Sequence, residues 1–227
     1  MAKQAVVDKP DTQEMVVVHR VFRREFRLAP QIVRQVSEGD VARASVVVAH
    51  LTEMGTMLHH HHSGEDELVW PRLNERAQVS ADLVARMEAQ HEQVAGLMHR
   101  VDELRAQWAA SASATVRDEL AAVLTELSSA LDAHLDEEER EVLPLIEQHL
   151  SCKEWDELGE RGRAGIPKPR MLVVLGHILE DTSPEERTTF LGHMPPPARV
   201  LYRMLGQRKF DREVAVLRRD IPAQRQR

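Results

Sequence analysis

The sequence of 227 residues is poor in cysteine, glycine and aromatic residues. Cys152 is its only cysteine, which rules out an intramolecular disulfide and a thiolate-rich metal site. Ten glycines and 4% aromatic residues, beside abundant Ala, Leu, Val, Glu and Arg, favour helices over strands. No apolar run approaches the roughly 20 residues that a membrane span needs, and residues 1–10 lack the apolar core of a signal peptide. We therefore expect a cytoplasmic, all-α protein with no membrane partner.

The charge and the hydrophobic content of the chain limit its possible partners and indicate a buried core. The formal net charge of −7 gives no general reason to expect binding to nucleic acid or to an anionic membrane. Hydrophobic residues make up 42% of the chain, which is enough for a buried core. A chain of this length can hold one domain of about 150 residues together with a smaller appendage.

Four consecutive histidines, at positions 59–62, form the most unusual stretch of the sequence. The run is internal, whereas affinity tags lie at chain ends, so it belongs to the protein itself. Within it, His61 and Glu65 are four residues apart, which places both side chains on one face of a helix. His134 and Glu138 repeat the same H-x-x-x-E spacing.

The repeat extends beyond these two motifs. A proline follows each motif at the same distance, as Pro71 and Pro144. His19 and His91 precede the two motifs at nearly equal distances along the chain. A repeat of this kind in a helical chain predicts two similar helical hairpins related by a pseudo-two-fold axis, with the matching groups converging in the middle.

Apolar residues recur at helical spacing in four segments, which begin near residues 12, 41, 80 and 115. Polar helix-start signals accompany them, such as Ser80 followed by Asp82. In each segment a repeated histidine, or a histidine with its carboxylate, replaces apolar residues in the stripe that faces the core. The sequence therefore predicts that these polar side chains are buried together.

Buried imidazoles and carboxylates need compensation, because an unpartnered ionised carboxylate costs several kcal/mol in a protein interior. A cation that accepts every ligand is the simplest account of a repeated set of six groups. Imidazoles and carboxylates without sulfur suit iron, manganese or zinc, and six ligands exceed what one tetrahedral zinc ion uses. Two ions that share both carboxylates fit better, which favours a di-iron centre. The predicted metal ligands are His19, His61, Glu65, His91, His134 and Glu138.

These residues resemble the pattern of the hemerythrin-like family, also called the HHE cation-binding domain, over roughly residues 12–150. The resemblance implies an up-down four-helix bundle of hemerythrin type that holds two non-haem iron ions, oxo- or hydroxo-bridged. Members of the family bind dioxygen or its reduction products. They act in oxygen carriage, in oxygen or iron sensing, and in handling peroxide or nitric oxide.

One position departs from the oxygen-carrying members of the family. They have a further histidine one turn after the third-helix ligand, where this chain has Ala95. Four histidines instead of five make the two irons more alike, which favours peroxide turnover over oxygen carriage. We therefore expect a di-iron protein that binds or turns over dioxygen or peroxide, including catalase-like peroxide decomposition. The alternatives are a module that senses iron, oxygen or redox state without turnover, and a purely structural metal.

We expect the other histidines and acids near the motifs to lie outside the set of metal ligands. We expect His59, His60 and His62 to point outward or to support the ligands from behind. His62 with Asp66, and Glu139 beside Glu138, offer a register shifted by one residue. His50, His149, His177 and His193 lack a partner at helical spacing and are interpreted as surface or capping residues.

We predict three parts in the chain: an N-terminal arm over residues 1–11, the four-helix bundle with its metal site over 12–150, and a linker with a C-terminal helical extension over 151–227. Helical patterns recur in the extension, and basic residues accumulate from Arg199 onward. A packed or dimerising helical extension with a solvated basic face accounts for this better than a nucleic-acid site. The extension is therefore the predicted contact of a homodimer.

Overall fold

The computed structural model describes residues 9–77, 79–192, 194–219 and 221. Most of the N-terminal arm predicted over residues 1–11 lies outside this range, as does His193. Within the described residues every regular element is a helix. None of these helices combines the length and hydrophobicity that crossing a lipid bilayer requires.

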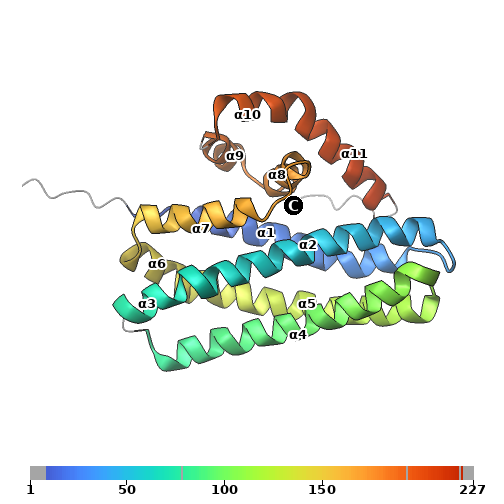
Figure 1. The fold of residues 1–227 in the computed structure, drawn as a ribbon, viewed down its shortest axis with the longest axis horizontal. Helices are drawn as coiled ribbons and strands as arrows, with labels where there is room; N and C mark the ends of the chain where they lie inside the picture. The colour runs from blue at the N-terminus through green and yellow to red at the C-terminus, as the bar shows by residue number, and fades with distance from the viewer. Residues whose placement is uncertain (1–8, 78, 193, 220, 222–227) are drawn as a thin grey trace, which may run out of the picture.

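The bundle consists of helices α1 (Gln13–Arg34), α2 (Val41–Leu68), α4 (Ala81–Ser111) and α5 (Ala114–Glu137). Figure 1 shows these four rods lying lengthwise beside one another. Contacts join α1 to α2, α2 to α4, α4 to α5 and α5 back to α1, so the four helices close a ring around a common core. The predicted up-down four-helix bundle is confirmed.

Short connections with specific caps reverse the chain between these helices. The Asp40 carboxylate accepts a hydrogen bond from the Arg43 backbone N–H at the start of α2, and the Ser80 hydroxyl does the same for Leu83 at the start of α4. Between α4 and α5 the chain turns through Ala112, whose φ of 49° is left-handed. A left-handed residue ends a helix sharply, which lets α5 fold back along α4.

The two repeated prolines interrupt the bundle helices at matching places. Pro71 lies in the first turn of α3 (Trp70–Arg76), just after α2 ends. Pro144 lies in the first turn of α6 (Leu143–His149), after a π-helical turn, η1 (Glu138–Val142). Proline lacks an N–H, and its ring collides with the carbonyl four residues earlier in an α-helix, so a widened turn before Pro144 relieves that collision.

Two apolar clusters fill the bundle, one toward each end. The larger contains Phe22, Leu58 and Val94, and the smaller contains Met15 and Met87. On α1 and α4, His19 and His91 lie in sequence between members of the two clusters, and just beyond α2 and α5 the smaller cluster continues with Val69 and Val142. The polar side chains are therefore sealed on both sides by close-packed apolar residues.

The C-terminal extension is helical and packs along the bundle (Figure 1). The segment predicted as a linker begins with α7 (Cys152–Ala164), which starts at a capping box formed by Ser151 and Glu154 and lies against α2. The elements that follow α7 are α8 (Met171–Leu179), α9 (Pro184–Gly192), α10 (Pro196–Leu201), the π-helix η2 (Tyr202–Gly206) and α11 (Gln207–Leu217). Of these, α8 lies against α1, and α11 lies against α8.

Two histidines expected at the surface are buried where the extension meets the bundle. The His50 side chain is 8% exposed and lies 3.1 Å, Nε2 to Oε2, from Glu25 of α1. The His177 side chain, from α8, is 3% exposed and contacts the same carboxylate. The surface interpretation of these two residues was wrong, because each pairs with a carboxylate on a different element, which spacing along one helix cannot reveal. His149 lies in the last turn of α6.

Candidate metal centre

Seven side chains from the four bundle helices and η1 converge in two groups that share one carboxylate. In each group every residue offers a ligand atom within 4.8 Å of the others. The two-imidazole group comprises His19, His61, Glu65 and Glu138. The three-imidazole group comprises His62, Glu65, His91 and His134.

The two-imidazole group is compact. The Nε2 atoms of His19 and His61 lie 3.1 Å apart. His61 Nε2 is 3.2 Å from Glu65 Oε1, and His19 Nε2 is 3.5 Å from Glu138 Oε2. Two ligands that each lie about 2.0–2.2 Å from a metal ion, at tetrahedral to octahedral angles, are separated by about 2.9–3.5 Å. These three spacings match that range.

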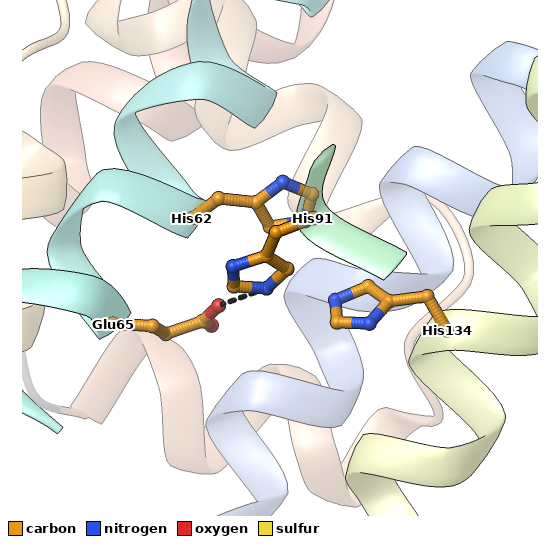
Figure 2. Close-up of side chains that lie close together, drawn as sticks. All are labelled: His62, Glu65, His91 and His134. Atoms are coloured by element: carbon orange, nitrogen blue, oxygen red, sulfur yellow. Dashed lines mark ion pairs between the residues drawn. The ribbon is translucent and has the colours of Figure 1, made fainter. Parts of the chain in front are cut away.

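The three-imidazole group, drawn in Figure 2, shares Glu65 with the first group. The rings of His62 and His91 stack with centroids 4.4 Å apart, and the His134 ring stands edge-on to both. Glu65 reaches this group through its second oxygen, because Oε2 lies 3.7 Å from His91 Nε2 (Figure 2). Glu65 therefore presents one oxygen to each group, as a bridging carboxylate does. Glu138 Oε2 lies 3.8 Å from His134 Nε2 and so also faces both groups.

Outer hydrogen bonds orient three of the imidazoles. Glu139 Oε1 accepts from His19 Nδ1 at 2.8 Å, and Asp66 Oδ1 accepts from His91 Nδ1 at 3.0 Å. The Nδ1 of His134 lies 3.1 Å from the amide oxygen of Gln90. A hydrogen on Nδ1 leaves the lone pair on Nε2, which is the atom that each ring turns toward the centre.

Several inward-facing atoms have no hydrogen-bond partner in the described part of the chain. They are buried and comprise Glu65 Oε1, Glu138 Oε2, His62 Nε2 and His134 Nε2. Buried polar atoms are almost always paired, since each unpaired one costs about 1–3 kcal/mol. Carboxylate oxygens and imidazole lone pairs can all coordinate a cation. Two cations would give each of these atoms a partner, so the residues present fit a two-metal centre.

The surroundings keep three of the imidazoles neutral. Burial, followed by the charges of neighbouring histidines, lowers the pKa of His61 and of His62 well below the ordinary value. The same causes, with His91 as the largest neighbour, lower the pKa of His134 to about 3. An imidazole that stays unprotonated at neutral pH keeps a lone pair available for a metal.

The carboxylates shift the opposite way. Burial and repulsion from Glu138 raise the pKa of Glu65 well above its ordinary value. Burial also raises the pKa of Glu138. Without a cation, the interior therefore favours a protonated carboxyl at this point. A bound cation reverses that preference by stabilising the ionised form.

The family comparison settles the classification. The model of the Hemerythrin HHE cation binding domain matches residues 11–146, which is more than half of the chain. The chain belongs to the hemerythrin HHE cation-binding family. Neither the curated proteins nor the solved structures gave a significant match. Membership in this family supports cation binding, and the two His/Glu groups are where the structure offers it.

All six residues predicted as ligands of the HHE centre lie in these two groups. Glu65 and Glu138 point inward and are 4% and 3% exposed. Asp66 and Glu139 would be the ligands if the register were shifted by one residue. Instead they accept hydrogen bonds from the Nδ1 atoms of His91 and His19, on the side of each ring that faces away from the centre. Whether each residue ligates a metal remains a prediction that metal analysis must test.

His62 is the residue that sequence reasoning missed. It was expected to point outward or to support the ligands from behind, but it is 9% exposed and its ring contacts those of both His91 and His134. The fifth imidazole therefore comes from α2, next to His61, and not from the position of Ala95 on α4. Neighbouring helix residues are about 100° apart, so two adjacent histidines can face the two halves of one wide site. The unbroken histidine run was the available signal.

Proposed function

We propose that this protein is a non-haem di-iron protein that binds dioxygen or peroxide inside its helical bundle. The observation that carries the proposal is the placement of Glu65, whose two oxygens face two separate groups of imidazoles. One carboxylate between two sets of neutral nitrogen ligands is suited to hold two ions close together. A nitrogen and oxygen ligand set without sulfur agrees with iron.

The burial of the centre supports a small ligand. The side chains of His61, His91 and Glu65 are only 9%, 11% and 5% exposed. The larger apolar cluster lies on one side of the centre along the bundle, and the smaller cluster lies on the other. A substrate larger than a few atoms has no room between them, whereas dioxygen, peroxide and nitric oxide are small enough to enter.

The inequality of the two groups indicates where such a ligand binds. Glu65 and Glu138 face both groups, and three imidazoles serve one group against two in the other, so the group containing His19 and His61 has one protein ligand fewer. The expectation of two similar irons rested on four histidines, and His62 removes that basis. Unequal groups favour binding of the small ligand on the two-imidazole side. When bound, iron supplies the redox chemistry that dioxygen and peroxide require.

The test is an oxygenation cycle on iron-loaded protein. The protein is reduced without oxygen, exposed to dioxygen and then degassed, while its absorption spectrum is followed. Peroxide consumption is measured in parallel against the same amount of free iron. We expect a new absorption on oxygen exposure or peroxide consumption above the free-iron level, and neither in a Glu65→Ala variant. No spectral change together with no excess consumption would reject the proposal.

A sensing function is the second candidate, and one observation favours it. Helix α1 carries His19 at the centre and Glu25 at the contact with the extension. Arg20 and Arg24 of the same helix pair with Glu186 and Asp181 of the extension. A change at the iron centre that shifts α1 therefore reaches the extension directly. We place either function in the cytoplasm, with the extension as the contact for a partner or a second copy.

A further inference from the structure

A second group of buried imidazoles and carboxylates lies where the extension meets the bundle. Glu25 of α1, His50 of α2 and His177 of α8 meet there, with Glu53 of α2 beside them. His50, Glu53 and His177 each offer a ligand atom within 4.8 Å of the others. Along α2, His50 precedes His61 by eleven residues, or about 16 Å of helix, so this group is separate from the iron centre.

Two acceptor atoms in this group face each other without a hydrogen bond. Glu25 Oε2 and His50 Nε2 lie 3.1 Å apart, yet neither has a hydrogen-bond partner among the described residues. The Glu25 side chain is 1% exposed and that of His50 is 8% exposed. A separation of 3.1 Å is what two ligands of one zinc ion show, because each lies about 2.0–2.2 Å from the metal.

The other oxygen of Glu25 is fully occupied. Oε1 receives Arg24 Nε at 2.8 Å and Arg218 at 2.6 Å, and it lies 3.2 Å from His177 Nδ1. Hydrogen bonds of this kind orient a metal-bound carboxylate from behind. The two guanidinium groups that pair with Oε1 stabilise the ionised carboxylate, and Oε2 points toward His50.

The charges around the group leave negative charge in excess. Arg24 and Arg218 both pair with Glu25 and Glu180, Arg24 also pairs with Asp181, and Arg170 pairs with Glu53 and Glu213. Three guanidinium groups thus face five carboxylates among the described residues. With neutral imidazoles, this network carries an excess of two negative charges, which one divalent cation neutralises.

We propose that His50, Glu53 and His177, whose ligand atoms lie within 4.8 Å of one another, bind one divalent cation of the zinc class, with Glu25 Oε2 beside His50 as a further ligand. Two imidazoles and a carboxylate form a ligand set that zinc accepts, with a fourth position for Glu25 or water. The ligands come from α1, α2 and α8, so the cation fastens the extension to the bundle. The site does not depend on the identity of the metal in the iron centre.

The test is a cobalt titration of full-length protein that has first been loaded with iron. Cobalt(II) replaces zinc in such sites, and its visible absorption reports nitrogen and oxygen ligands. We expect wild-type protein to take up one equivalent of cobalt, and His50→Gln and His177→Gln variants to take up less than a tenth of that amount. His99→Gln, at a side chain that is 78% exposed, is the matched control and should behave as wild type.

A Glu65→Ala variant separates this site from the iron centre, since it should lose iron and still bind the cobalt equivalent. Circular dichroism establishes whether each variant is folded. If a histidine variant is not folded, Glu53→Gln, which leaves both imidazoles in place, is tested instead. The rival account is a proton on His50 in place of a metal. Nitrogen NMR showing His50 as an imidazolium in zinc-treated wild-type protein, or equal cobalt uptake by all the variants, would overturn the proposal.

Discussion

Glu65 is the carboxyl that lies between both halves of the candidate metal centre. Its carboxyl lies between the two groups of imidazoles, and burial with repulsion from Glu138 raises its pKa well above the ordinary value. A raised pKa means that the metal-free carboxyl keeps its proton at a pH where an exposed glutamate has lost it. Metal binding must therefore expel that proton. His61, His62 and His134, whose pKa values are lowered, have no proton to release at that pH.

This difference predicts proton release on metal binding. Calorimetry of ferrous ion binding without oxygen, at about pH 6 in buffers of different ionisation enthalpy, should show one or two protons released per chain. These protons come from Glu65 and Glu138, whose pKa values are both raised. A Glu67→Gln variant, which alters an exposed side chain paired with Arg161, should release the same number. Release of four or more protons would show that the imidazoles are charged, contrary to this account.

The histidine run allows a matched comparison of neighbouring residues. His62→Ala removes one imidazole from the three-imidazole group, whereas His60→Ala changes a ring that contacts His59 and lies outside both groups. We expect the first change to weaken binding of one of the two ions by more than the about 10–100-fold that loss of an outer partner costs. The second change should leave metal content within error of wild type. Equal effects would mean that His62 is not a ligand.

The sequence predicted six of the seven residues in the two groups, because each occupies an apolar stripe at helical spacing. His62 could not be predicted in this way. It lies next to His61 in the sequence and therefore outside the buried apolar stripe of α2. Both histidines reach the metal centre only because the centre is wide enough to be lined by two neighbouring residues of one helix. His50 and His177 were missed for another reason. Their common partner, Glu25, lies on a third helix, and contacts between distant elements are not visible in a local pattern.

At the scale of the helices, η1 brings two consecutive glutamates to different partners. Glu138 faces both imidazole groups, while Glu139 binds His19 Nδ1 and also receives Arg23 at 2.6 Å. This contact joins α1 to the turn that follows α5. The helices were predictable because their caps and apolar stripes are local. The π-helical turn was not, because it depends on how Pro144 is accommodated.

Glu139 therefore acts as a positioning residue for His19. Glu139→Gln weakens the acceptor on His19 Nδ1, and we expect it to lower iron affinity by about 10–100-fold, since outer partners of histidine ligands commonly have effects of this size. Asp136→Asn is the control, because Asp136 pairs with the same Arg23 but contacts no imidazole of the centre. A competition assay with a chelator measures both. An Asp136 effect as large as that of Glu139 would assign the loss to Arg23 instead.

At the scale of the whole molecule, the centre lies between the two apolar clusters and its charges are isolated from solvent. Removing the metals leaves buried acceptors unpaired, so the bundle loses stability at its middle. A ligand at 100 times its Kd stabilises a fold by about 2.7 kcal/mol, and about 1 kcal/mol shifts the melting temperature of a chain of this size by about 2–4 °C. Two ions bound at that level contribute about 5 kcal/mol together, so we expect chelation to lower Tm by about 10 °C or more. In the Glu65→Ala variant, which has already lost the metals of the bundle, a chelator should lower Tm by much less than in the wild-type protein.

Metal analysis of the purified full-length protein, by quantitative elemental determination per chain, tests the central claim most directly. We predict two iron ions per chain in the wild-type protein, with near-ultraviolet absorption of an oxygen-bridged ferric pair. In Glu65→Ala both ions should be lost together, since the carboxylate faces both groups. One ion per chain in the wild-type protein, or a Glu65→Ala variant that keeps one ion at full occupancy, would contradict the account.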